Sequence, residues 1–180
     1  SVGIFNKGAR QPDRQPHRPL RYLYVGRLVE AKNIDLLIEE FNRNGKPLTI
    51  VGNGVLEQTL KRQTHDNITF LGFVENERLG DIYQEHDVFI LPSKYEPWGL
   101  VVEEALYWGL PVIASDKVGS ATDMVEDLNT GCIFQSGSIN GLHNAIVHME
   151  ECYTKYKEQV LTIDWPERDR KQVNAYISLI

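Results

Sequence analysis

Short apolar stretches alternate with amphipathic stretches from residue 20 onward. The β-like stretches fall at residues 20–25, 47–51, 68–71, 88–91, 111–114 and 131–134. Helical patterns occupy residues 33–41, 55–63, 76–84, 99–108, 122–126, 139–153 and 166–180. Strands that alternate with helices indicate right-handed crossovers and a parallel sheet, and continuous apolar stretches indicate strands buried on both faces. The pattern therefore predicts an α/β, Rossmann-like protein with a doubly wound, six-stranded parallel sheet in the order 3-2-1-4-5-6.

Length, charge and cysteine content narrow the class of protein. A chain of 180 residues can form one core, so one domain is expected. The net charge of −6 argues against a nucleic-acid partner, which would favour a basic excess. Cys132 and Cys152 lack a metal-ligand spacing and are interpreted as free thiols in a reducing compartment. With no apolar stretch of about 20 residues and no signal peptide, the sequence predicts a cytoplasmic protein that could work at the inner face of a membrane through another part.

The opening segment, residues 1–19, differs from the rest of the chain. It combines Arg10, Arg14 and Arg18 with several prolines and shows no apolar period. Its basic residues could contact phosphate or lipid, but an extended, solvated linker between domains is the favoured interpretation. The chain is thus divided into a linker at residues 1–19, a ligand-binding domain at residues 20–164 and a final helix at residues 165–180.

The loop after the first predicted strand carries two cations. Gly26 permits a close approach of backbone to a ligand, and Arg27 and Lys32 bracket the loop before the next helix. An arginine fork together with a lysine point charge can clamp a diphosphate. The alternative is two surface cations, one of them paired with Glu30.

The next two loops carry weaker signals. Gly52-Asn53-Gly54 follows the second predicted strand but lacks the third glycine of a dinucleotide fingerprint, so by itself it favours a plain tight turn. Phe73 and Val74 follow the third predicted strand, where backbone groups could contact a nucleotide base. From the residues alone, a place for Phe73 in the core is the favoured interpretation.

Two glutamates eight positions apart give the most informative signal. Glu96 lies on a loop, because Pro97 and Gly99 disfavour helix there, whereas Glu104 lies on the following helix. Helical periodicity does not choose between Glu103 and Glu104, and Glu103 is interpreted as a solvent-exposed helix residue. A carboxylate at the end of a strand can hold vicinal sugar hydroxyls while free helix amides face an anion. The arrangement suits a nucleotide-sugar.

Five motifs together resemble a known family. They are Gly26-Arg27-Leu28 with Lys32, Gly52-x-Gly54, Phe70-Leu-Gly-Phe-Val74, Glu96-Pro-Trp-Gly-Leu-Val-Val-Glu-Glu104-Ala105 and Gly109-Leu-Pro-Val-Ile-Ala114. In this order they resemble the family 4 (group 1) glycosyltransferases, and more narrowly the carboxyl-terminal, donor-binding domain of the GT-B fold. The likeness covers roughly residues 22–131. Departures are Asn53, where an acid is common, Gly119-Ser120 in place of two glycines, and Glu103 at a position that is often apolar.

The resemblance implies a role for each motif. Arg27 and Lys32 would bind the donor diphosphate, Glu96 would face the transferred sugar, and these three would form the catalytic set. Glu104 would hold the ribose hydroxyls, and Phe73 with Val74 would border the base. The whole donor site is expected to comprise Gly26, Gly52, Asn53, Phe73, Val74, Trp98, Gly99, Leu100, Val101 and Glu104.

The resemblance also implies an activity, namely transfer of a sugar from a nucleoside diphosphate sugar to a glycan, lipid or other acceptor with the anomeric configuration retained. Polysaccharide or lipopolysaccharide biosynthesis is the implied setting. No Asp-x-Asp motif occurs, so neither a metal nor another cofactor is expected. An amino-terminal acceptor-binding domain is not recognisable in the chain, which is therefore expected to be half of an enzyme and inactive by itself.

Three other functions remain open or are disfavoured. A nucleotide-sugar epimerase or a phosphorylase would share the fold and differ only in its reaction. A non-catalytic sugar-nucleotide binder would also share the site. A phospho-receiver module needs acids after the first strand to hold Mg²⁺, and Arg27 places the wrong charge there.

Overall fold

The computed structural model describes residues 14–166, which form one six-stranded sheet. The strands are β1 (Tyr22–Val25), β2 (Leu48–Val51), β3 (Ile68–Gly72), β4 (Val88–Leu91), β5 (Val112–Ser115) and β6 (Gly131–Phe134). All neighbouring pairs are parallel, in the order β3-β2-β1-β4-β5-β6. The predicted order is confirmed, and β4 and β5 are buried along their whole length as their apolar sequences indicate.

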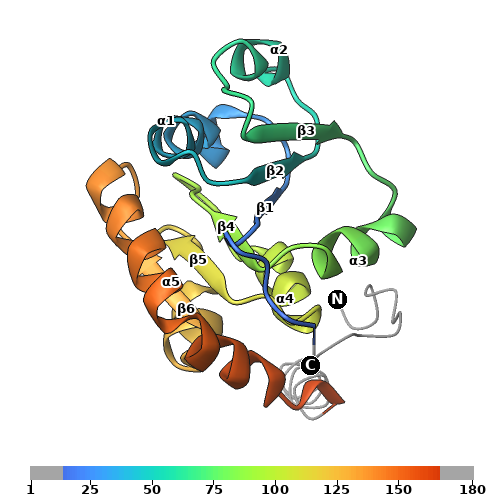
Figure 1. The fold of residues 1–180 in the computed structure, drawn as a ribbon, viewed down its shortest axis with the longest axis vertical. Helices are drawn as coiled ribbons and strands as arrows, with labels where there is room; N and C mark the ends of the chain where they lie inside the picture. The colour runs from blue at the N-terminus through green and yellow to red at the C-terminus, as the bar shows by residue number, and fades with distance from the viewer. Residues whose placement is uncertain (1–13, 167–180) are drawn as a thin grey trace, which may run out of the picture.

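The helices cover both faces of the sheet. They are α1 (Ile34–Asn44), α2 (Glu57–Lys61), α3 (Asn76–Gln84), α4 (Leu100–Tyr107) and α5 (Ile139–Leu161), with a 3₁₀ turn η1 (Glu30–Lys32) and a π-helical turn η2 (Thr122–Glu126). In Figure 1, α1 and α5 lie on one side of the sheet and α3 and α4 on the other. This two-sided cover is the reason that the central strands carry apolar residues on both faces.

Helix α5 is longer than the sequence pattern predicts. It begins after Ser138, whose hydroxyl oxygen accepts a hydrogen bond from the amide of Gly141 at 3.0 Å. The predicted helix ended at residue 153, but buried Tyr156 and Val160 continue its apolar face to Leu161. The helix expected at residues 166–180 lies almost wholly outside the described residues.

A buried carboxylate fixes the described start of the chain. Asp87, just before β4, accepts hydrogen bonds from the Arg14 guanidinium at 2.7 Å, from the Arg21 amide at 2.9 Å and from the His17 amide at 3.3 Å. Its Oδ2 also lies 2.9 Å from Nδ1 of the His17 ring. Burial alone would raise the pKa of Asp87, but these partners lower it below its ordinary value. Arg14 and His17 therefore bind the domain, although both belong to the predicted solvated linker. Residues 1–13 of that linker lie outside the described residues.

Two further features bear on the class of protein. None of the helices within residues 14–166 is long and apolar enough to cross a membrane. Cys132 is a buried free thiol, and Cys152 is a half-buried one.

The buried imidazole of His86 makes stability depend on pH. Its Nδ1 lies 2.6 Å from the carbonyl oxygen of Ile82 and its Nε2 lies 2.8 Å from the Thr49 hydroxyl. Burial is the largest influence on its pKa, which is lowered from 6.5. The unfolded chain therefore takes up a proton at a higher pH than the folded one. The free energy of unfolding should then decrease as the pH falls below the ordinary histidine pKa of 6.5 toward the lower pKa of folded His86, by up to about 1.4 kcal/mol per pH unit.

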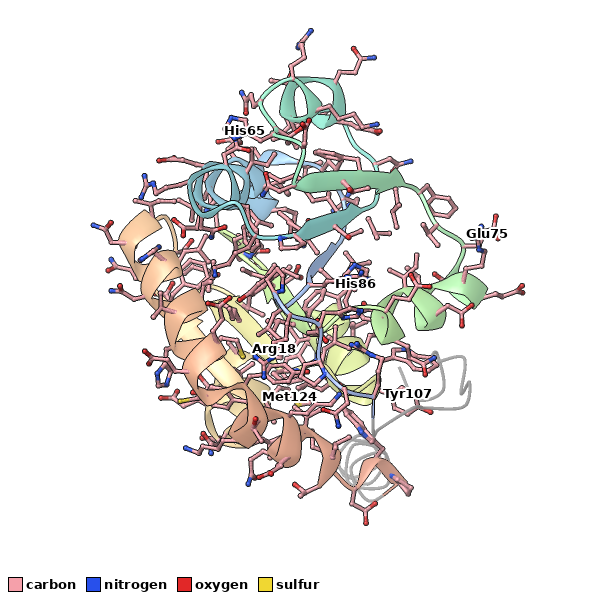
Figure 2. The ribbon with its side chains drawn as sticks, in the orientation of Figure 1. Arg18, His65, Glu75, His86, Tyr107 and Met124 are labelled. Carbon is pink, nitrogen blue, oxygen red and sulfur yellow. The ribbon has the colours of Figure 1, made fainter. Side chains whose placement is uncertain are left out.

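Urea denaturation at about pH 7.5 and about pH 5.5 would measure this effect. His86→Gln should flatten the dependence of the unfolding free energy on pH. His65→Gln is the matched control, because His65 lies at the surface (Figure 2). Equal pH dependence in the wild-type protein and His86→Gln would contradict the assignment to His86.

Candidate functional site

The loops after β1 and β2 pack backbone against backbone. The Gly26 amide donates to the Val51 carbonyl at 3.0 Å, and the Gly52 amide donates to the Gly72 carbonyl at 2.7 Å. Gly52 has a φ of 126°, and a Cβ at this position would collide with the carbonyl oxygen of Gly26. Only glycine satisfies both demands at position 52. The three glycines thus lie together at the edge of the sheet formed by the carboxyl ends of the strands.

A cavity of about 250 Å³ opens at this edge. Its lining is Val25, Gly26, Arg27, Val51, Gly52, Asn53, Phe73, Val74, Asn76 and Leu79. Five of these residues belong to the predicted donor site, and a sixth, Arg27, belongs to the predicted catalytic set. Asn76 and Leu79 were not predicted, because the sequence indicates only that they lie on a helix and does not show that α3 borders the cavity.

Phe73 and Arg27 are both available at the cavity. The Phe73 side chain is 69% exposed, so its interpretation as a core residue is wrong. The Arg27 carbonyl oxygen accepts from the Tyr24 hydroxyl at 3.1 Å, which fixes the backbone while the side chain stays exposed. Glu30 lies 3.5 Å from the Lys94 ammonium group, and Lys32 pairs with Glu96, so the alternative in which one of the two loop cations pairs with Glu30 is not supported.

Lys32 and Glu96 form an ion pair between the loops that follow the two central strands, β1 and β4. Lys32 ends the turn that follows β1, and Glu96 lies on the loop that follows β4, the neighbouring strand. Hydrogen bonds also join these two loops. The Lys94 amide donates to the Ala31 carbonyl at 2.8 Å, and the Asn33 side chain donates to the Pro92 carbonyl at 3.2 Å. The strand order reverses here, which is where doubly wound sheets bind ligands.

The loop after β5 supports the Glu96 loop. The Glu96 amide donates to the Lys117 carbonyl at 3.0 Å, and the Gly119 amide donates back to the Glu96 carbonyl at 2.9 Å. A Cβ on Gly119 would collide with the Pro97 carbonyl oxygen. This supporting role was missed, because a glycine in a polar loop gives no sign of which backbone it contacts.

Helix α4 starts beside Glu96 with free amides. Gly99 has a φ of 89°, and the first hydrogen-bonded amide of the helix is that of Val102, which donates to the Gly99 carbonyl at 2.8 Å. The amides of Leu100 and Val101 are therefore available to an anion or a hydroxyl. Gly99 is required at the junction, because its left-handed conformation is unfavourable for other residues.

The two carboxylates on α4 have different surroundings. Glu104 accepts a hydrogen bond from the buried Tyr83 hydroxyl at 3.2 Å. Burial raises the pKa of Glu104, the charge of Glu103 adds to that effect, and the Tyr83 bond opposes it. Glu103 itself is only 6% exposed and accepts a hydrogen bond from the Trp98 indole at 2.7 Å. The prediction that Glu103 faces solvent is therefore wrong.

The predicted site residues form two groups at one edge of the sheet. One group lines the cavity at the ends of β1, β2 and β3. The other, which does not line that cavity, consists of Lys32, Glu96, Trp98, Gly99, Leu100, Val101 and Glu104. Within residues 14–166, no three histidine, cysteine, aspartate or glutamate side chains are grouped so that they could hold a metal ion.

The chain belongs to the group 1 glycosyl transferases, since the sequence model of that family matches residues 7–160. It is 30% identical over 148 residues to a GDP-mannose-dependent alpha-mannosyltransferase of Mycobacterium tuberculosis, which covers 79% of this chain and 39% of the relative. It is also 30% identical over 175 residues to a glycogen synthase of Thermodesulfovibrio yellowstonii, covering 87% of this chain and 35% of the relative.

The fold agrees with that family. A sucrose-phosphate synthase of Thermosynechococcus elongatus superimposes with a TM-score of 0.71 at 26% identity, over 89% of this chain and 45% of that structure. The two curated relatives are likewise matched over less than half of their own length. The described domain therefore corresponds to one part of larger glycosyltransferases of the GT-B fold, as the sequence motifs imply.

The Lys32–Glu96 pair makes a prediction about anion binding. Glu96→Gln should strengthen binding of inorganic pyrophosphate roughly threefold to tenfold, because the Lys32 ammonium group then lacks a competing carboxylate; this corresponds to about 1 kcal/mol. Isothermal titration with pyrophosphate measures the effect, and added salt should reduce it.

Lys32→Gln should weaken pyrophosphate binding in the same assay. Glu75→Gln serves as the control, since Glu75 is an exposed acid outside both groups of site residues (Figure 2). Unchanged pyrophosphate affinity in Glu96→Gln would mean that the ion pair does not limit access of anions to Lys32.

Proposed function

We propose that this chain is the donor-binding part of a retaining glycosyltransferase that transfers a sugar from a nucleoside diphosphate sugar to a glycan or lipid acceptor. The observation that carries the proposal is that two groups of predicted site residues lie at the same edge of the sheet. A cavity that suits a nucleoside lies at β1–β3, and a cation paired with a carboxylate lies at the reversal point between β1 and β4. Membership in the group 1 family supports it.

The base of the nucleoside would occupy the cavity. Its walls combine the glycine backbone at positions 26 and 52 with the exposed ring of Phe73 and the half-buried side chain of Val74. Apolar walls with a few polar groups are typical of small-molecule sites. Glu104, with two carboxylate oxygens, would accept from the two ribose hydroxyls. Its raised pKa favours a site that gains hydrogen-bond donors when ligand binds.

The diphosphate would bind between the cations and the start of α4. Arg27 offers a fork of donors, Lys32 a point charge, and Leu100 with Val101 two backbone amides. When the bond between the anomeric carbon and the diphosphate oxygen breaks, its electron pair stays on the diphosphate. These groups would stabilise that charge, a type of stabilisation that is usually the largest contribution to catalysis.

Glu96 would orient the donor sugar. Its carboxylate is already engaged by Lys32, so it is suited to accepting hydrogen bonds from sugar hydroxyls rather than to attacking carbon. The acceptor hydroxyl would form the new bond to the anomeric carbon and give its proton to the departing diphosphate oxygen. The acceptor would come from a further domain, because this chain matches less than half of the relatives' length.

Ligand-observed NMR with UDP, GDP and ADP, and with UDP-glucose, GDP-mannose and ADP-glucose, tests the proposed function. At least one nucleotide and its sugar should bind. Absence of binding by all six would overturn the donor-site assignment. Binding without turnover, once a complete enzyme is assayed, would instead favour a sugar-nucleotide binder. An altered or phosphorylated sugar as product would favour an epimerase or a phosphorylase.

Two substitutions should separate the contacts to the diphosphate from the contacts to the nucleoside. Arg27→Ala should weaken nucleoside diphosphate binding by ~1–3 kcal/mol, because it removes a charge-assisted bond, and should change nucleoside binding much less. Glu104→Gln should weaken nucleoside and nucleoside diphosphate alike, because both carry the ribose. Isothermal titration of both variants with each ligand decides the matter. Equal losses of the two ligands in Arg27→Ala would place Arg27 away from the phosphates.

A further inference from the structure

A hydrogen bond between two side chains crosses the junction of the Glu96 loop and helix α4. The Trp98 indole N–H donates to Oε1 of Glu103 at 2.7 Å. Trp98 lies one residue before Gly99, and Glu103 is the fourth residue of α4. The bond therefore ties the loop that carries Glu96 to the helix that carries Glu104.

Packing alone does not account for a glutamate at position 103. Its neighbours Val102, Ala105 and Leu106 are fully buried, so an apolar side chain would suit the same surroundings. A buried carboxylate is costly unless it is hydrogen-bonded, and the indole has one donor to give. The first turn of a helix also favours negative charge. Glu103 is thus stabilised where it lies, and its specific contact is Trp98.

The backbone of the loop is held from the other side. The Ser120 amide donates to the Trp98 carbonyl at 2.9 Å, and Gly119 lies against Pro97. The next residue, Gly99, has a φ of 89° and carries no side chain that could fix the direction in which the helix leaves. The Trp98 side chain spans this glycine, so its bond to Glu103 restrains the angle between loop and helix.

We propose that Glu103 is a positioning residue for the transferred sugar. By holding Trp98, it sets the place of the Glu96 carboxylate relative to the free amides of Leu100 and Val101. The inference rests on the proposed function, in which these groups face the sugar and diphosphate. It assigns to Glu103 no contact with the donor.

NMR of the three tryptophan indole N–H groups tests the hydrogen bond without any ligand. Trp98→Phe identifies the Trp98 signal. Glu103→Leu should move that signal and speed its exchange with solvent by about tenfold or more, since a hydrogen bond to a charged group is lost. Glu103→Gln retains an acceptor oxygen and should keep most of the protection.

Titration with UDP, UDP-glucose, GDP, GDP-mannose, ADP and ADP-glucose tests the positioning role. For the pair that the wild-type chain binds, Glu103→Leu should weaken the sugar nucleotide roughly fivefold to twentyfold and the free nucleotide less than about twofold. Trp98→Phe should likewise change the ratio of the affinity for the sugar nucleotide to the affinity for the free nucleotide. The double variant Trp98→Phe with Glu103→Leu should lose no more than the single variants. Glu151→Leu, at an exposed glutamate of α5, is the matched control.

Each outcome has a separate meaning. Equal weakening of both ligands, or an unchanged ratio in Glu103→Leu with an altered indole signal, would show a structural role only and would overturn the proposal. If Glu103→Leu does not fold, Trp98→Phe and Glu103→Gln still measure the ratio. If the wild-type chain binds no nucleotide, the proposed function fails and the positioning role fails with it. If it binds and the variants match it, the positioning role alone fails.

Discussion

The site depends on how closely the loops approach one another at the carboxyl edge of the sheet. A parallel sheet brings the ends of all its strands to one edge, but side chains would normally keep successive loops apart. Here Gly52 meets the backbone of Gly26, and Gly119 meets that of Pro97, at separations that leave no room for a Cβ atom. The loops after β1 and β4 are joined through their backbones as well, since the Lys94 amide donates to the Ala31 carbonyl, and this contact brings Lys32 to Glu96.

The sequence predicted the fold well because its signals are local and repeated. Six apolar stretches separated by helical patterns leave few arrangements for a right-handed parallel sheet. The end of α5 was missed because Tyr156 and Val160 follow several polar residues, and their burial depends on the sheet beneath them. The contact of Arg14 with Asp87 could not be predicted either, since it joins residues 73 positions apart through a buried carboxylate.

The candidate site was predicted in part, for a related reason. Glycine and charge at strand ends indicate where a site lies, and the residues expected on this basis, Gly26, Arg27, Gly52 and Asn53, line the cavity. Which side chains meet is a matter of tertiary packing. Glu103 was placed in solvent because charged residues rarely lie buried without a partner, and its partner is an indole whose direction no sequence pattern reports. Asn76 and Leu79 line the cavity because α3 borders it, and the sequence does not show where that helix packs.

The carboxylates around α4 show how one short segment can supply different chemistry. Glu96 faces a lysine ammonium group, so its charge is balanced before any ligand arrives. Glu104 is held by a neutral tyrosine hydroxyl, and burial raises its pKa, so it gains most from a ligand that brings further donors. Glu103 already accepts a hydrogen bond from the Trp98 indole, so its burial does not require a donor from a ligand. The proposed ligand, a diphosphate with a sugar at one end and a ribose at the other, matches this division. The sugar would meet Glu96, which is paired with a lysine, and the ribose would meet Glu104, which is bonded to a neutral hydroxyl.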